Sequence, residues 1–340
     1  MSRTAPYTAV TATALLLLAG CSSGSSSDAG SAGGTAKVAA VIKGLDNPFF
    51  QSMEQGLKDQ GTTAGITPTV QAATSITDTT GQADKLTALA GQDFSCYIVN
   101  PISGTNLVQG IAQLAAKKRT IVNIDSPVDP AAVKAANATP ATYIGTNNTS
   151  AGEKAGAHMV TLVPANAEVA AIGGIAGDVT SGARIDGFTK GITGKLRLVQ
   201  TVAANWERQE ALTQATNIMR AQPELAGFFV ANDDMGLGVA QAIANAGKTG
   251  KIKVISVDGN KDALTAVKNG GIDAVVAQYP YAIGLMGMEA CQAAAAGKTL
   301  PANVEAPVEL VTKDNADQAL AATPKPFGDY SDPFKTLIGS

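Results

Sequence analysis

The chain has 340 residues, of which 45% are hydrophobic and 16% are charged, and its formal net charge is −3. This composition is typical of a globular protein, and the length suggests about two domains. No basic run exceeds the three residues 117–119, so we expect no nucleic-acid partner, which would need a concentrated positive surface. One His and three Cys leave no Cys/His zinc cluster, and we expect neither a metal nor a cofactor.

The first segments in chain order resemble targeting signals. Arg3 precedes the uncharged apolar stretch 10–20, which is too short to span a bilayer. The stretch ends in the sequence LAGC at Cys21, which is similar to a bacterial lipobox. We therefore expect a signal peptide at 1–20, lipid attachment at Cys21 and a Ser/Gly-rich tether over 21–36. An ordinary signal peptide with an incidental Cys is the alternative.

From residue 37 onward, short apolar runs alternate with amphipathic segments. The apolar runs predict strands at 38–43, 68–72, 94–100, 120–125, 141–145, 168–173, 196–203, 227–232, 252–258 and 273–278. The amphipathic segments predict helices at 48–60, 80–91, 104–118, 150–162, 181–193, 207–221, 234–246, 260–269 and 281–296. This alternation predicts a doubly wound α/β fold with parallel sheets. Ten strands are more than one sheet of this type usually contains, so we expect two similar lobes.

The two remaining cysteines lie in apolar surroundings. Cys96 falls in a predicted strand and Cys291 in a predicted helix, which favours two buried free thiols. An exported location permits a disulfide, but the spacing alone does not bring the two Cα atoms close together.

Polar and aromatic residues follow the predicted strands at their carboxyl ends, where ligands bind in sheets of this type. The candidates are Asn47, Phe49, Phe50, Asn100, Asp125, Ser126, Trp206, Asn232, Asp258 and Gln278. Carboxylates and amides bind neighbouring hydroxyl groups, and aromatic faces cover the apolar side of a sugar. The set therefore favours a neutral polyhydroxyl ligand over a phosphate, a metal or a peptide.

Several of these residues have simpler interpretations. Phe50 is also compatible with core packing, and Asn47 with a helix N-cap before a Pro. Asp233 and Asp234 are interpreted as ordinary acidic partners of a helix dipole. His158 has no nearby nucleophile and is interpreted as a surface or packed residue.

Eight segments in chain order resemble the ribose-type (type I) periplasmic sugar-binding proteins of ABC importers. They are 47–50, 99–101, 122–125, 143–148, 175–188, 230–235, 257–259 and 277–280. The resemblance implies two Rossmann-like lobes joined by three crossovers and closing on a ligand by a hinge. The expected N-terminal lobe comprises 36–146 plus 279–309, and the C-terminal lobe comprises 147–278 plus 310–340.

The resemblance also implies which side chains contact a sugar. They are Asn47, Phe49, Phe50, Asp125, Trp206, Asn232, Asp258 and Gln278. Ser126 replaces an Arg of the family, and Gly182 falls on a second one in an ungapped alignment. Arg184 lies two residues further, about 200° around a helix, and is not expected to substitute. A cleft without these cations predicts a neutral ligand, either an acyclic polyol or a sugar other than ribose, unless Lys43 or Arg208 reaches in.

The resulting expectation is a monomeric lipoprotein on the outer face of the bacterial cell membrane, the periplasmic or cell-envelope side. It would deliver a sugar or polyol to an ABC permease with its cytoplasmic ATPase. A receptor that presents the ligand to a sensor or chemoreceptor is the alternative. An enzyme such as a glycosidase using Asp125 and Asp258 is disfavoured, because the flanking amides and aromatics suit ligand holding better.

Overall fold

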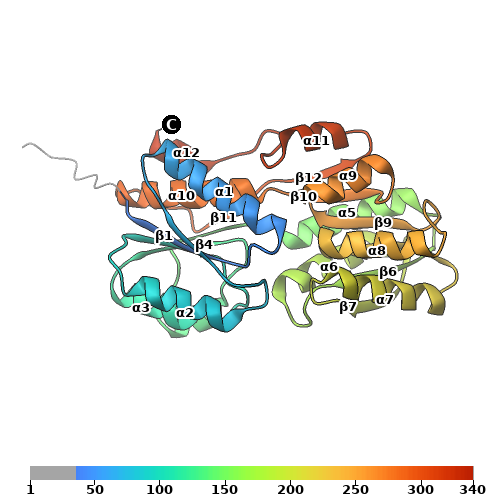
Figure 1. Ribbon diagram of the computed structural model, residues 1–340, viewed down its shortest axis with the longest axis horizontal. Helices are drawn as coiled ribbons and strands as arrows, with labels where there is room; N and C mark the ends of the chain where they lie inside the picture. Colours follow the sequence, from blue (N-terminus) through green and yellow to red (C-terminus); the bar gives the residue numbers. More distant parts are fainter. Residues whose placement is uncertain (1–35, 340) are drawn as a thin grey trace, which may run out of the picture. The chain divides into compact units, whose positions relative to one another are not determined.

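Two six-stranded sheets organise residues 36–339, the part of the chain that the computed structural model describes (Figure 1). The first sheet and its helices comprise β1 (Val38–Ile42), α1 (Pro48–Thr63), β2 (Thr69–Ala72), α2 (Thr79–Ala90), β3 (Cys96–Val99), α3 (Val108–Ala116), β4 (Thr120–Ile124), α4 (Pro130–Ala135), β5 (Thr142–Gly145), α10 (Pro280–Ala295) and β11 (Asn303–Glu305). The second comprise α5 (Asn148–Leu162), β6 (Glu168–Gly173), α6 (Val179–Ile192), β7 (Arg197–Ala203), α7 (Arg208–Ala221), β8 (Leu225–Val230), α8 (Asp233–Asn245), β9 (Lys253–Asp258), α9 (Lys261–Asn269), β10 (Ala274–Gln278), β12 (Val308–Thr312) and α11 (Ala316–Ala322). A last helix, α12 (Pro333–Ile338), follows.

The two sheets have the same strand topology. Their strand orders are β11-β5-β4-β3-β1-β2 and β12-β10-β9-β8-β6-β7. Every pair of neighbouring strands is parallel except β10 and β12. The expectation of two doubly wound parallel lobes is therefore confirmed, and the carboxyl ends of the strands carry the loops that matter for binding.

Helices cover both faces of each sheet, so the central strands are fully buried. In the first lobe α1 and α10 lie on one face while α2 and α3 lie on the other (Figure 1). The α1 and α10 backbones approach closely because both helices carry glycine at the contact. A Cβ on Gly56 would lie 2.0 Å from the Tyr281 carbonyl oxygen, and one on Gly284 would lie 2.2 Å from that of Met53.

The C-terminal region departs from the expected lobe boundaries. The sequence places a change of lobe between residues 309 and 310, but β11 ends at Glu305 in the first sheet and β12 begins at Val308 in the second. The sequence also assigns 310–340 to the second lobe. Of this segment α11 packs against α9, whereas α12 packs against α10 of the first lobe (Figure 1). The Phe334 side chain of α12 is fully buried there, which explains the return of the chain.

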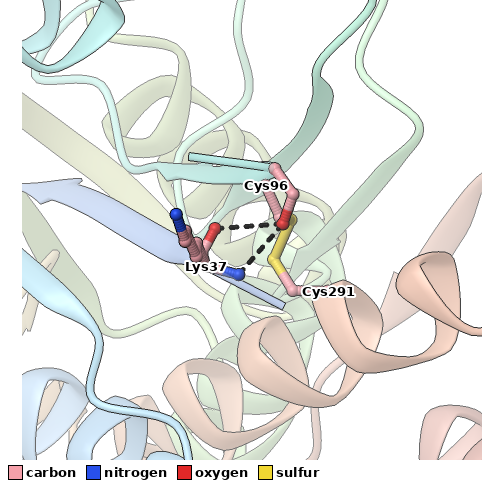
Figure 2. The surroundings of a disulfide bond; sticks show 4 residues. Lys37, Cys96 and Cys291 are labelled. Carbon is pink, nitrogen blue, oxygen red and sulfur yellow. Dashed lines mark hydrogen bonds between the residues drawn. A yellow bond between two sulfur atoms is a disulfide. The ribbon is translucent and has the colours of Figure 1, made fainter. Parts of the chain in front are cut away.

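Cys96 and Cys291 form a disulfide with their Cα atoms 5.8 Å apart, so the expectation of two free thiols is wrong. Figure 2 shows the bond between the start of β3 and α10, beside the backbone of Lys37. The two residues are 195 positions apart in the chain. Only the docking of α10 onto the first sheet brings them together, and no local pattern in the sequence reports that contact.

Residues 1–35 and 340 lie outside the described residues. The predicted signal peptide, Cys21 and nearly all of the predicted tether fall there. Within 36–339, no helix combines the length and the apolar character needed to cross a membrane.

Candidate functional site

A cavity that is partly open to solvent lies at the carboxyl ends of the two sheets. The residues that line it come from both lobes: Lys43, Asn47, Phe49, Phe50, Ile76, Ile102, Asp125, Ser126, Ile175, Asp178, Thr180, Arg184, Trp206, Asn232 and Asp258.

Most of the residues predicted from the sequence meet in this cavity. Those that line it are Asn47, Phe49, Phe50, Asp125, Ser126, Trp206, Asn232 and Asp258. Gln278 does not line the cavity but contacts a residue that does. Its Nε2 donates to Asp258 Oδ1 at 2.7 Å. Asn100 is elsewhere: it is buried under α1, where its side-chain nitrogen lies 3.4 Å from the Met53 sulfur.

The first lobe places a carboxylate and a cation side by side. Asp125 follows β4 with a φ of 60°, a backbone conformation that few L-residues adopt outside turns and functional sites. Lys43 directly follows β1, and its Nζ lies 3.6 Å from Asp125 Oδ2. The same Nζ donates to Ser126 Oγ at 2.7 Å. A cation therefore occupies this part of the cavity although no Arg follows Asp125.

The second lobe repeats the pairing with different residues. Asp258 ends β9 with a φ of 138°, and Arg184 of α6 places Nη1 3.3 Å from its Oδ1. Arg184 is also fixed by donating to the Ala231 carbonyl oxygen at 2.6 Å and to Asn148 Oδ1 at 2.8 Å. This buried guanidinium lies where the sequence analysis placed no cation, so that expectation is wrong.

The error over Arg184 has a simple cause. The rotation of about 200° between residues 182 and 184 follows from helix geometry, but the ungapped alignment took the wrong residue as the inward one. A Cβ on Gly182 would meet no atom within 4 Å. Gly182 therefore faces open space and Arg184 faces the cavity.

Aromatic rings from both lobes border the cavity. Phe49 and Phe50 open α1 and pack edge to face, with ring centroids 5.1 Å apart. Lys43 Nζ lies 5.4 Å from the Phe50 centroid. On the other side the Arg184 guanidinium lies 5.9 Å from the Trp206 ring. Each lobe therefore supplies a carboxylate, a cation and an aromatic ring on which that cation rests.

Trp206 depends on an unusual local backbone. It follows β7 with a φ of 66°. Its indole packs directly on Gly174, where a Cβ would lie only 2.1 Å away. Any larger residue at 174 would displace the ring, so the glycine reserves the space for it.

Two asparagines line the cavity and also cap helices. Asn47 Oδ1 accepts from the Phe49 backbone N–H at 2.9 Å, and Asn232 Oδ1 accepts from that of Met235 at 2.9 Å. The N-cap interpretation of Asn47 is therefore correct, and it is compatible with a place in the cavity. The two helix starts hold both amides at fixed positions.

Two buried carboxyl groups of the second lobe, Asp258 and Asp233, have raised pKa values. Burial raises the pKa of Asp258 to about 6, although the Arg184 guanidinium and the Gln278 amide oppose the shift. Burial also raises the pKa of Asp233, and the Asp258 charge acts in the same direction. Asp233 is fully buried, whereas its neighbour Asp234 forms a surface ion pair with Arg208 at 2.7 Å.

The sequence did not single out several lining residues. Lys43 appeared only as a remote candidate, although a lysine immediately after a buried strand was a usable signal. Arg208, the other candidate cation, points to Asp234 instead. Asp178 caps α6 by accepting from the Ser181 N–H at 2.7 Å, and Ile76, Ile102 and Ile175 form apolar parts of the wall. Within residues 36–339, no group of three or more His, Cys, Asp or Glu side chains is placed to hold a metal.

Comparison with known proteins agrees with this architecture. A family model described as "Periplasmic binding protein domain" matches residues 38–299. The D-allose-binding periplasmic protein of Escherichia coli is 34% identical over 285 residues, which cover 83% of this chain and 92% of the relative. The ribose import binding protein of Bacillus subtilis is 29% identical over 272 residues, covering 80% and 86%.

Solved structures give the same result. A periplasmic solute-binding protein of an ABC transporter from Actinobacillus succinogenes, with bound D-allose, superposes with a TM-score of 0.79 at 26% identity. The match covers 83% of this chain and 99% of that one. The chain therefore belongs to the ribose-type periplasmic binding proteins, a family of binding proteins rather than enzymes.

Proposed function

We propose that the chain is the substrate-binding protein of an ABC importer and that it captures a neutral monosaccharide in the cavity between its lobes. The observation that carries the proposal is the matched set on the two sides of the cavity. Asp125 and Lys43 face it from the first lobe, and Asp258 and Arg184 from the second. Two carboxylates are each paired with a cation, and the third lining carboxylate, Asp178, leaves no excess positive charge, so the cavity suits hydroxyl groups better than an acid or a phosphate.

The aromatic rings support a sugar rather than a fully polar solute. Phe50 and Trp206 offer apolar faces to the C–H side of a pyranose or furanose ring. The expectation of an acyclic polyol or a sugar other than ribose assumed a cleft without cations, and Lys43 and Arg184 contradict that assumption. Lys43 and Arg184 carry donors that suit a ring oxygen, so a cyclic aldose fits the site. Relatives named for D-allose and ribose are in keeping with this class of ligand.

A thermal-shift screen followed by calorimetry tests the ligand class. We expect D-allose or another neutral aldose to bind tightest among aldoses, a polyol, a sugar acid and a sugar phosphate. Asp258→Ala should weaken that binding by about 2–5 kcal/mol, because it removes a charged partner from a desolvated site. Asp234→Ala, which removes a neighbouring surface carboxylate, should have no effect. Tightest binding of the acid or the phosphate would contradict the proposal.

We further propose that Cys21 carries a lipid that holds the protein at the outer face of the bacterial cell membrane, beside its permease. The support is the LAGC sequence at Cys21 and the Ser/Gly-rich tether that follows it. Wild-type protein from a lipidating host should enter the detergent phase and Cys21→Ala should stay in the aqueous phase. An intact mass of the wild type that shows an unmodified Cys21 would contradict the anchor.

A further inference from the structure

Asp233 is a fully buried carboxyl group that does not line the cavity. It is the first residue of α8, where an acidic residue usually lies in solvent and interacts with the helix dipole. Its neighbour Asp234 behaves in that way and pairs with Arg208 at the surface. Burial of a carboxyl group costs free energy unless its oxygens find donors, so the partners of Asp233 indicate what it does.

The partners of Asp233 bracket Asp258. Its Oδ1 accepts from Ser256 Oγ at 2.5 Å, and its Oδ2 accepts from the backbone N–H groups of Gly259 and Asn260 at 2.8 Å and 2.7 Å. Ser256 lies two residues before Asp258, and the two backbone donors belong to the residues that follow it. One side chain of α8 therefore fixes the end of β9 on both sides of Asp258.

The bracketed turn needs such support, because its backbone is strained. Asp258 has a φ of 138° and Gly259 a φ of 87°, and L-residues with a Cβ rarely adopt the former. Without Asp233 the two N–H groups that this conformation turns inward would lose their acceptor. The turn would then relax toward an ordinary conformation, and the Asp258 carboxylate would leave its place beside Arg184.

The two carboxyl groups also interact through their charge. The charge of Asp258 raises the pKa of Asp233, beyond the effect of burial. Four groups act on the pKa of Asp258 beside burial: the Arg184 guanidinium, the Gln278 amide and the Asp233 backbone N–H lower it, and the Asp125 carboxylate raises it. The negative charge of this pair therefore forms first on Asp258, and Asp233 acts on Asp258 through hydrogen bonds rather than through its own charge.

We propose that Asp233 is a positioning residue for the cavity, whose buried carboxyl group holds the strained turn 258–260 and thereby fixes the Asp258 carboxylate that faces the ligand. We call the hydrogen bonds from Ser256, Gly259 and Asn260 to Asp233 the clamp. The clamp does not depend on which ligand the chain binds. The consequence for sugar affinity rests on the proposed function.

Three variants of the full chain separate these effects. Asp233→Ala removes the acceptor. Asp233→Asn keeps it, since the amide oxygen can accept from both N–H groups while the NH2 group donates to Ser256 Oγ, but it carries no charge. Asp234→Asn is the matched control, because it neutralises the adjacent residue of the same helix turn at the surface.

The first measurements need no ligand. Amide hydrogen exchange at Gly259 and Asn260 should accelerate at least about tenfold in Asp233→Ala and stay near the wild-type rate in the other two variants. The 13C titration of the Asp258 carboxyl should stay near the wild-type value in Asp233→Asn, which keeps the hydrogen bonds of the turn, and in Asp234→Asn. Protected amides in Asp233→Ala would overturn the clamp. If Asp233→Ala does not fold, exchange in the folded wild type decides: unprotected amides at Gly259 and Asn260 there would overturn the clamp.

Calorimetry with D-allose and D-ribose then measures the consequence for binding. Asp233→Ala should weaken the tighter of the two at least about tenfold, and Asp233→Asn should restore most of that loss. Loss of amide protection with unchanged affinity would overturn the positioning role. If neither sugar nor any other of the screened panel binds the wild type, the proposed function fails, while amide exchange still decides the clamp.

Discussion

At the scale of single residues, the chemistry of the cavity depends on strained backbone as much as on side-chain type. Asp125, Trp206 and Asp258 all have positive φ values, and each costs roughly 1–3 kcal/mol that the surrounding structure must offset. The sequence predicted these residues correctly as strand-end groups, because the carboxyl ends of parallel strands converge. It missed Arg184 because a two-residue alignment error on a helix exchanges the buried face for the exposed one.

The raised pKa of Asp258 predicts acid-sensitive binding. Burial raises this pKa to about 6, and only the carboxylate accepts hydroxyl protons with both oxygens. Affinity for the sugar should therefore be constant above about pH 7 and fall by about tenfold near pH 5. Calorimetry across this range measures it. Stability has the opposite trend: for this group the raised pKa stabilises the folded chain at low pH, and that contribution disappears as pH rises through about 6.

Asp125→Asn is the informative comparison for this titration. The charge of Asp125 raises the pKa of Asp258, so the variant should bind more weakly overall and lose affinity at a lower pH than the wild type. An affinity that stays flat from neutral pH to about pH 5 in the wild type would show that the Asp258 carboxylate does not hold the ligand.

At the scale of elements, strands and helices with a clear hydrophobic period were predictable and the C-terminal pieces were not. β6 has the predicted ends, Glu168 and Gly173, because it is a continuous buried run. β11 spans only Asn303–Glu305 and has no period of its own. α12 is a short helix capped by Asp332, and its place on α10 depends on the single buried ring of Phe334. Packing of that kind leaves no pattern in the sequence.

The disulfide between β3 and α10 predicts a large effect of reduction on the first lobe. The bond links positions 195 residues apart, and a loop of that length strongly restricts the unfolded chain, so its loss should cost about 2–5 kcal/mol. Chemical denaturation of Cys96→Ala/Cys291→Ala against the oxidised wild type measures this difference. Addition of a reductant should lower the stability of the wild type and leave the double variant unchanged. Equal stabilities would indicate that the bond adds no constraint beyond the packing of α10.

At the scale of the whole molecule, the fold places the two halves of one site on separate lobes. Lys43, Phe50 and Asp125 come from the first, and Arg184, Trp206 and Asp258 from the second. Neither lobe lines the cavity alone, because both contribute residues to its wall. This division was predictable, because a duplicated strand–helix pattern specifies two sheets whose carboxyl ends both carry polar loops. The charge of the cavity was not predictable from the sequence, because it depends on the directions in which the Lys43 and Arg184 side chains point.

Closure on the ligand should therefore be visible in the single Trp of the chain. Trp206 borders the cavity, with the Arg184 guanidinium 5.9 Å from its ring. A sugar that replaces water against the indole should change its emission, and closure of the hinge should reduce the radius of gyration in small-angle scattering. The two changes should saturate at the same sugar concentration, because one event causes both. A sugar that binds by calorimetry but alters neither signal would exclude both the stacking of Trp206 and closure of the lobes, and the affinity would then have to come from one lobe alone.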